Sequence, residues 1–303
     1  MTVYHVPDGL AAMPVRSFLK QMGISTNYWK KVKFSGTFLC NGELISHPAL
    51  LMVSGGDTIS WDLREQTDVV PENLPLDIRY EDDALLIVNK PCGQLVHPTR
   101  REVTGTLANA VLGYYERQGI QAAFHPVHRL DRNTTGLVLI VKEPRFHHQL
   151  SPKGKKLFCR EYLAIVSGTP SPSSGTIDAP IARDPSSIIR RCVSPDGQDA
   201  ITHYETLRTF RGMSLLRLRL ETGRTHQIRV HLSHMGHPLI GDDLYGGTRE
   251  LIGRQALHAF RLTLPHPVTG KELVVTAELP SDMVSIFSKI LSRPYTPDAV
   301  SMV

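Results

Sequence analysis

The chain has 303 residues, of which 41% are hydrophobic and 21% charged, and its formal net charge at neutral pH is +5. This length suits one large domain with a smaller one, and the composition excludes fibrous and disordered proteins. The longest apolar stretches, ALLIV and GLVLIV, are strand-sized and far shorter than the roughly 20 residues of a membrane span. Because the opening MTVYHVPDGL has no basic segment followed by an apolar one, we expect no signal peptide and a cytoplasmic location.

Metal and cofactor motifs are missing from the sequence. Four cysteines, at positions 40, 92, 159 and 192, are too widely spaced for a zinc motif, and His125 and His128 have no evident third ligand. Neither a glycine-rich phosphate loop after a strand nor a G-x-S-x-G nucleophile motif occurs. We therefore expect no metal and no cofactor. The basic charge suits a polyanionic partner, although many proteins with such a charge bind none.

Residues 1–64 are predicted to form a small helix-and-strand domain. From Pro14, apolar residues at helical spacing predict a helix that stops at Gly23, and Ser25 is predicted to cap a second, basic helix. Asn41-Gly42 predicts a hairpin turn, and GGDTISWDL a further strand. The polar, proline-containing residues 65–76 are predicted to be a linker.

Residues 77–303 are predicted to form the larger domain, around a mixed or antiparallel sheet. Its short strands are LDIRYED, ALLIVNKP, GLVLIVK, REYLAIVSG, SLLRLRLETG and ELVVTAEL. Helices are predicted from Leu107 to Gly119, from a cap at Thr225 to Gly236, and from a cap at Ser281 to before Pro294. The fold class is therefore α+β.

Asp131 lies between two arginines in HPVHRLDRNTTGLVLIVK, just before an apolar run. Nearby cations lower the pKa of a carboxyl group and keep it charged, so Asp131 could act as a nucleophile or a base. The alternative is structural: Asp131 pairs with an arginine or caps a turn. This segment alone leaves both interpretations open.

The segment HRLDRNTTGL resembles the H-R-L-D-x-x-[TS]-[ST]-G-L signature of the RluA-type family of pseudouridine synthases. Four further segments resemble family motifs, in the family's order, between about residues 76 and 280: IVNKPCGQLVHP, REYLAIVSG, LETGRTHQIRVHLSHMGHPLIGDDLYG and LHAFRLTLPHPVTG. The resemblance implies the pseudouridine-synthase fold and the isomerisation of uridine in RNA, in which the base is detached from the ribose, turned and rejoined through its carbon 5. No external reactant is consumed.

The resemblance also implies the site residues. Asp131 is the essential carboxylate, which attacks the base or the sugar or removes a sugar proton. Tyr162 stacks on the uracil and helps to remove the carbon 5 proton. Arg229 pairs with the aspartate, and Arg129 enters the stack that the flipped uridine leaves. Arg224 and His128 are assigned to RNA binding, and for His128 a scaffold role in the loop is the alternative.

Residues 14–45 resemble, more distantly, a small RNA-binding module of a ribosomal small-subunit protein. They depart from its usual opening, in which an arginine, a leucine and an aspartate begin the first helix. Lys30, Lys31 and Lys33 are predicted to meet RNA phosphates, although lysines on a helix are most often only solvated.

Together these patterns predict a cofactor-free RNA pseudouridine synthase acting on structured RNA, either ribosomal or transfer RNA, with a monomer as the default state. Two alternatives remain. The chain could be an RNA-binding or ribosome-assembly factor that has lost catalysis, or a hydrolase using Asp131 with a second carboxylate such as Glu161 to cleave glycosidic bonds.

Overall fold

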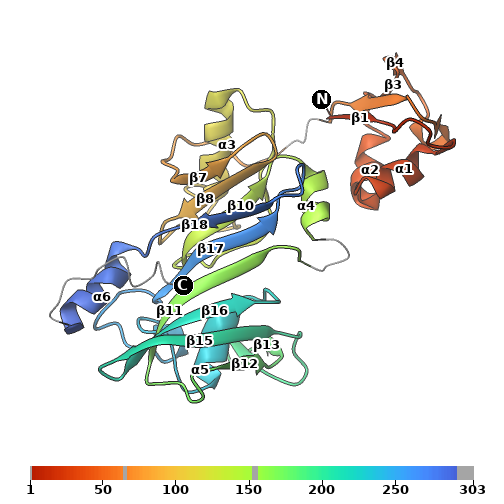
Figure 1. Ribbon diagram of the computed structural model, residues 1–303. Helices are drawn as coiled ribbons and strands as arrows, with labels where there is room; N and C mark the ends of the chain where they lie inside the picture. The colour runs from red at the N-terminus through yellow and green to blue at the C-terminus, as the bar shows by residue number, and fades with distance from the viewer. Residues whose placement is uncertain (1, 64–66, 152–155, 292–303) are drawn as a thin grey trace.

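The computed structural model describes residues 2–63, 67–151 and 156–291. Its main element is a sheet (Figure 1) whose strands are β7 (Ile78–Glu81), β8 (Leu85–Lys90), β9 (His125–Pro126), β10 (Thr135–Val141), β11 (Cys159–Ser167), β12 (Ser174–Asp178), β15 (Ile201–Phe210), β16 (Met213–Leu220), β17 (Leu257–Pro265) and β18 (Glu272–Thr276). The strand order is β12-β15-β16-β11-β17-β10-β8-β7, with β18 beside β17 and β9 beside β10. Among the described strands, only the β10–β17 pair is parallel. The predicted mixed, mainly antiparallel sheet is confirmed.

The alternating side chains of the sheet build cores on both faces. On β11, Tyr162 and Ala164 lie in one core with Leu107 of α3 (Leu107–Gln118) and Ile228 of α5 (Gln227–His234). The intervening Leu163 packs in a different core, with side chains of α6 (Ser281–Leu291). Further along the sheet, β8 and β10 alternate in the same way, and their second face packs on α4 (Pro144–Leu150). This two-sided burial explains why the strand segments read as nearly continuous apolar runs.

The parallel pair depends on a glycine of the HRLDRNTTGL segment. Gly136, with φ +116°, lies so close to β17 that a Cβ there would be 2.3 Å from the carbonyl oxygen of Ala259. Any larger residue would push the two strands apart. Beside it, Thr135 Oγ1 lies 2.8 Å from His258 Nδ1 of β17. The segment that carries Asp131 therefore enters the middle of the sheet directly.

Residues 2–63 form a separate small sheet with two helices over it. Its strands are β1 (Thr2–His5), β3 (Leu39–Cys40), β4 (Glu43–Leu44) and β6 (Thr58–Trp61), in the order β1-β6-β3-β4, and β2 (Met13–Pro14) pairs with β5 (Met52–Val53). The helices are α1 (Val15–Gln21), α2 (Thr26–Val32) and the 3₁₀ turn η1 (Pro48–Leu50). Stacked rings of Tyr4, Phe38 and Trp61 form its centre.

Two predicted signals in this unit are confirmed in detail. Ser25 Oγ accepts the backbone N–H of Tyr28 and so caps α2. Asn41 and Gly42 both have positive φ, 50° and 84°, as the two-residue turn between β3 and β4 requires. The boundaries of the predicted domains at residues 64 and 76 stay a prediction.

Part of the predicted linker is fixed to the larger unit. Residues 67–76 form no helix or strand, but the Glu72 backbone N–H donates to the Asn109 carbonyl of α3 (2.9 Å) and the Glu72 carboxylate accepts the Gly105 N–H (3.0 Å). Gly113 allows residues 67–76 to pass close to α3, since a Cβ at position 113 would lie 2.0 Å from the Glu72 carbonyl oxygen. The small unit itself meets α4 through Arg145, whose guanidinium lies over the Tyr4 ring (5.1 Å).

The predicted helices are present, with two corrections. Ser281, the predicted cap of α6, is instead the first residue of that helix. The helix beginning near Leu107 ends at Gly119, which is left-handed, and Pro294 lies outside the described residues. The prediction that Thr225 caps α5 is wrong: the capping position is His226, whose φ is +60° and whose side chain makes no capping hydrogen bond. The 3₁₀ turn η3 (Asp243–Tyr245) and the hairpin β13 (Ile181–Arg183) with β14 (Arg191–Val193) lie near α5. None of the described helices is long and apolar enough to cross a membrane.

Candidate active site

A cavity of about 520 Å³ opens where the HRLDRNTTGL segment, β11 and the start of α5 meet. Its volume is in the range of small-molecule sites and is ample for one nucleotide. Six predicted site residues line it: Asp131, Tyr162, Arg229, Arg129, His128 and Arg224. The structure thus brings together residues that lie up to 101 positions apart in the chain, between His128 and Arg229.

The loop that presents Asp131 is tied down by buried side chains. Lys90, at the end of β8, is 1% exposed, and its Nζ donates to the carbonyls of Arg132 (3.0 Å), Pro91 (2.8 Å) and Gln94 (2.8 Å). Burial lowers the pKa of Lys90 to about 7. Arg254 also donates to the loop, at the Asn133 carbonyl (3.3 Å). Sequence analysis missed both cations, because their contacts with the loop, Lys90 with Arg132 and Arg254 with Asn133, join residues that are distant in sequence.

Asp131 does not pair with its sequence neighbour Arg132. Arg132 instead holds Glu102 in a bidentate ion pair. The Asp131 carboxylate, 27% exposed, lies 3.4 Å from Arg229 Nη1 and 3.9 Å from His226 Nε2. The cation that faces Asp131 is therefore not the adjacent Arg132 but Arg229, from a helix 98 residues away, which corrects the expected pairing with Arg132.

Arg229 itself is held by an aspartate that the sequence did not single out. Its Nε and Nη2 donate to the two oxygens of Asp242, both at 2.7 Å, and the Asp242 side chain is only 1% exposed. Burial acts to lower the pKa of Arg229, but hydrogen bonds and charge from Asp242, with the charge of Asp131, raise it overall. The paired Arg229 stays protonated and presents its remaining nitrogen, Nη1, to Asp131.

His226 approaches the same carboxylate because of its left-handed backbone. Its Nδ1 lies 2.8 Å from Tyr245 Oη, which also accepts the Arg191 N–H (2.9 Å). Burial lowers the pKa of His226, so the imidazole is neutral at neutral pH. With Tyr245 donating its O–H to Nδ1, the remaining ring proton is assigned to Nε2, the atom nearest Asp131. A side chain that made a capping hydrogen bond from this position would instead point toward the first N–H groups of α5.

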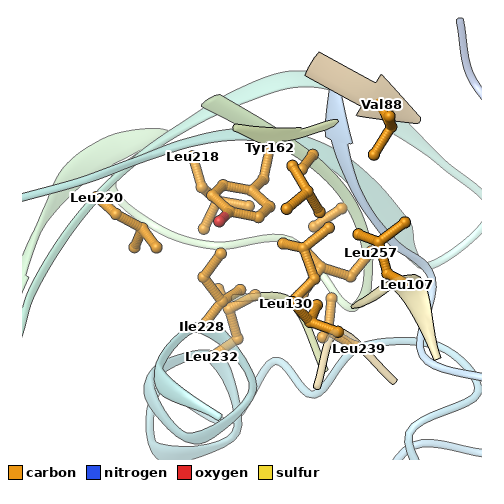
Figure 2. Close-up of a cluster of buried hydrophobic side chains, with 14 of the residues drawn as sticks. Val88, Leu107, Leu130, Tyr162, Leu218, Leu220, Ile228, Leu232, Leu239 and Leu257 are labelled. Carbon is orange, nitrogen blue, oxygen red and sulfur yellow. The ribbon is translucent and has the colours of Figure 1, made fainter. Parts of the chain in front are cut away.

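Tyr162 lines the cavity and packs on apolar side chains of the core. Figure 2 shows its ring among Leu130, Leu218 and Ile228, and the residue is 4% exposed. Burial, supported by the charge of Asp131, raises the pKa of Tyr162, so its phenol is neutral at neutral pH. Its neighbour Glu161 does not line the cavity and lies 3.6 Å from Arg261. The pair of carboxylates that the hydrolase alternative needs is therefore not formed by Asp131 and Glu161.

The predicted RNA-binding residues fall into two groups. Arg129 and Arg224 are exposed at the cavity, and Arg224 Nε donates to the Asp199 carbonyl (2.8 Å). His128 is buried, its Nε2 accepts the Leu139 N–H (3.2 Å), and its pKa lies well below the usual value because of burial and the charges of Arg160 and Lys156. A neutral, buried His128 favours the scaffold role.

The three predicted lysines of the N-terminal unit do not line the cavity. Lys30 and Lys31 are exposed on α2, and Lys33 lies at its end with its Nζ 4.4 Å from the centre of the Phe34 ring. Among residues 2–63, 67–151 and 156–291, no three histidine, cysteine, aspartate or glutamate side chains gather as a metal site would require.

Comparisons with known proteins agree with this arrangement. Residues 84–234 match the family model described as RNA pseudouridylate synthase. The chain is 43% identical over 277 residues to the uncharacterized RNA pseudouridine synthase YjbO of Bacillus subtilis, covering 89% of this chain and 97% of that protein. It is 39% identical to the ribosomal large subunit pseudouridine synthase D of Escherichia coli K12, covering 82% and 81%.

Solved structures share the fold. The human RNA pseudouridylate synthase domain containing 4 superposes with a TM-score of 0.57 at 26% identity, covering 72% of this chain and 94% of that one. Sequence and structure therefore agree on the enzyme class, an isomerase that acts on RNA. The chain belongs to the RluA-type family of RNA pseudouridine synthases.

Proposed function

We propose that this chain converts specific uridines of large-subunit ribosomal RNA to pseudouridine, with Asp131 as the carboxylate that reacts with the nucleoside. The observation that carries the proposal is the Asp131 carboxylate lining a nucleotide-sized cavity, 3.4 Å from an arginine that is itself fixed by a buried aspartate. Relatives named ribosomal large subunit pseudouridine synthase D, at 39% to 42% identity, support the ribosomal substrate.

Chemically, the reaction breaks the bond between uracil N1 and ribose C1′ and joins C5 to C1′. The C5 proton is lost and N1 gains a proton, so the product is an isomer of the substrate. Arg229 Nη1, 3.4 Å from the Asp131 carboxylate, holds the carboxylate in place, where it can reach the base or the sugar. Tyr162 provides a flat surface for the uracil and, as a neutral phenol, donates a hydrogen bond rather than accepting a proton at rest. The apolar side chains that pack against Tyr162 limit water near the detached base.

A uridine stacked in RNA must leave its stack to reach this cavity. Flipping costs about a few kcal/mol, which contacts with the vacated site can offset. Arg129 is exposed at the cavity rim and is free of any ion pair within the described parts of the chain. Its planar guanidinium suits insertion between bases, and we assign it this role.

The substrate class is tested by mapping. Unmodified large-subunit ribosomal RNA and transfer RNA are each incubated with the full chain, and pseudouridine positions are located by carbodiimide labelling and primer extension. We expect one or a few defined positions in ribosomal RNA. Modification of transfer RNA alone would overturn the substrate class while leaving the isomerase assignment intact.

Tyr162→Phe tests the role of the phenol. The variant keeps the ring and the apolar packing but removes the hydroxyl, so RNA affinity and thermal stability should be close to those of the wild type. We expect kcat to fall by about 10²-fold, as for loss of a hydrogen-bond donor that stabilises charge developing on the uracil. Single-turnover rates at saturating RNA measure this, and an unchanged rate would reduce Tyr162 to a packing residue.

The N-terminal unit is proposed to bind RNA through Lys30, Lys31 and Lys33. Replacing all three with glutamine should weaken RNA binding and make it less sensitive to salt. If each lysine neutralises one phosphate, the slope of log affinity against log salt concentration should decrease by about 2. Binding titrations at several salt concentrations give the slope. An unchanged slope would mean that these lysines are only solvated.

A further inference from the structure

Three cations gather at one wall of the cavity: Lys156, Arg160 and Arg224. We call them the basic corner. All three line the cavity. A Cβ built on Gly223 would lie 2.6 Å from Lys156 Nζ and 3.1 Å from Arg160 Nη1, so both heads lie against the same backbone segment. The two heads are therefore within about 6 Å of each other, a distance at which like charges repel.

The basic corner has no carboxylate partner within the described parts of the chain. Within residues 2–63, 67–151 and 156–291, none of its three members forms an ion pair. Arg160 is only 3% exposed, yet its Nη2 donates to a neutral group, the Thr222 carbonyl (2.7 Å), and its buried Nε has no hydrogen-bond partner. By contrast, Arg229 has both Asp242 and Asp131.

The electrostatic consequences are visible in the neighbouring groups. Burial first, and then the charges of Arg160 and Arg224, lower the pKa of Lys156 to about 8. Burial and the charges of Arg160 and Lys156 also keep His128 neutral. A buried charge without a partner is unfavourable, so this arrangement is explained best by an anion that binds there in the working state.

We propose that Lys156, Arg160 and Arg224 bind a backbone phosphate of the nucleotide whose uracil lies between Asp131 and Tyr162. This inference rests on the proposed function and adds the phosphate contact to it. A phosphodiester in RNA has two non-bridging oxygens, which share one negative charge and can accept from a guanidinium and an ammonium group together. Arg160 lies two residues before Tyr162 on β11, so the phosphate and the base would be held by one strand.

The absence of a side chain at Gly223 fits the same site. A methyl group there would displace the Lys156 head, because its Cβ would approach Nζ to 2.6 Å. The polypeptide backbone at this position thus leaves the two cationic heads side by side and open to the cavity. A uracil carbonyl could accept from one of these groups, but it carries no charge to offset three cations.

The first test uses Lys156→Gln and Arg224→Gln in the full chain, since Arg160 is too buried to replace without risk to folding. Each variant should raise KM for RNA about tenfold, the usual loss for one charged hydrogen bond, while kcat falls less than KM rises. Lys271→Gln, an exposed lysine in the turn between β17 and β18, is the matched control and should leave KM unchanged. Unchanged KM in both cavity variants would overturn the proposal.

The second test identifies the ligand as phosphate. Short RNA substrates carry a neutral methylphosphonate on either the 5′ or the 3′ side of the target uridine. At one of the two linkages, the methylphosphonate should lower the affinity of the wild type about tenfold. The same methylphosphonate should lower the already reduced affinity of Lys156→Gln by little more. If the methylphosphonate lowers the affinity of Lys156→Gln as much as that of the wild type at both linkages, the phosphate assignment is overturned.

These outcomes are separable from a failure of the proposed function itself. Pseudouridine formation by the wild type on the unmodified RNA tests the function, and Asp131→Asn should abolish it whatever happens at the basic corner. A wild type that forms pseudouridine with no coupling between Lys156 and either linkage would reject the phosphate contact alone.

Discussion

Replacing Asp131 with asparagine is expected to lower the single-turnover rate by about 10⁴-fold or more while leaving RNA affinity within about threefold of the wild type. Asparagine keeps the side-chain volume but removes the negative charge and the reactive oxygen. The loop around residue 131 should keep its conformation, because Lys90 and Arg254 hold it through carbonyl groups that the substitution does not touch. Rates at saturating RNA, with binding measured in parallel, separate the two effects.

The binding measurement is the internal control for this variant. Lost turnover together with lost binding would indicate a damaged cavity and would not support a chemical role for Asp131. Retained turnover would remove Asp131 from the mechanism and return it to the structural role that the sequence left open, as an arginine partner.

Replacing Asp242 with asparagine is expected to have the second largest effect. The substitution removes the charge that fixes Arg229, and breaking such a buried ion pair costs about 3 kcal/mol or more. A mobile Arg229 should also orient Asp131 poorly, so kcat should fall by about 10²-fold even at temperatures where the variant is fully folded. Thermal unfolding gives the loss of stability, and rates well below the melting temperature give the loss of catalysis.

Two controls distinguish positioning from simple destabilisation. Asp243→Asn changes the neighbouring residue, whose carboxylate is exposed and paired with Arg249, and should change neither property. Asp282→Asn breaks another bidentate pair, with Arg254, and should lower stability with a smaller effect on kcat. If Asp242→Asn resembles Asp282→Asn in its ratio of stability loss to rate loss, Asp242 has no special role in orienting Arg229.

A double variant adds a further check. Arg229→Met with Asp242→Leu replaces the buried pair by apolar side chains, which is often neutral or stabilising. We expect this protein to recover much of the stability lost in Asp242→Asn, yet to remain catalytically impaired because Asp131 has lost the guanidinium that pairs with it. Recovery of both properties would contradict the role given to Arg229.

The sequence predicted features that depend on a few adjacent residues. Ser25 caps its helix, Asn41-Gly42 forms a hairpin turn and Gly119 ends a helix, since each acts through its own backbone geometry. The alternation of leucine and arginine on β16 also follows from the strand period alone. The family motifs located Asp131, Tyr162 and Arg229, which the fold brings to one cavity.

Features that depend on distant partners were not predicted. GDDLYG contains two aspartates, and only the fold shows that Asp242 is buried against Arg229 while Asp243 is exposed. Arg132 looked like a partner of Asp131 because it is adjacent, but Glu102 lies closer in space. His226 adopts a left-handed conformation that is unusual for a residue other than glycine, and no local signal marks it.

The most direct test of the account is the chromatography of nucleosides after digestion of unmodified large-subunit ribosomal RNA treated with the full chain or with Asp131→Asn. We expect the wild type to form pseudouridine as uridine disappears in equal amount, without free uracil, and Asp131→Asn to form none. Free uracil in place of pseudouridine, or pseudouridine made by Asp131→Asn, would contradict the assignment of Asp131 as the reacting carboxylate of an RNA uridine isomerase.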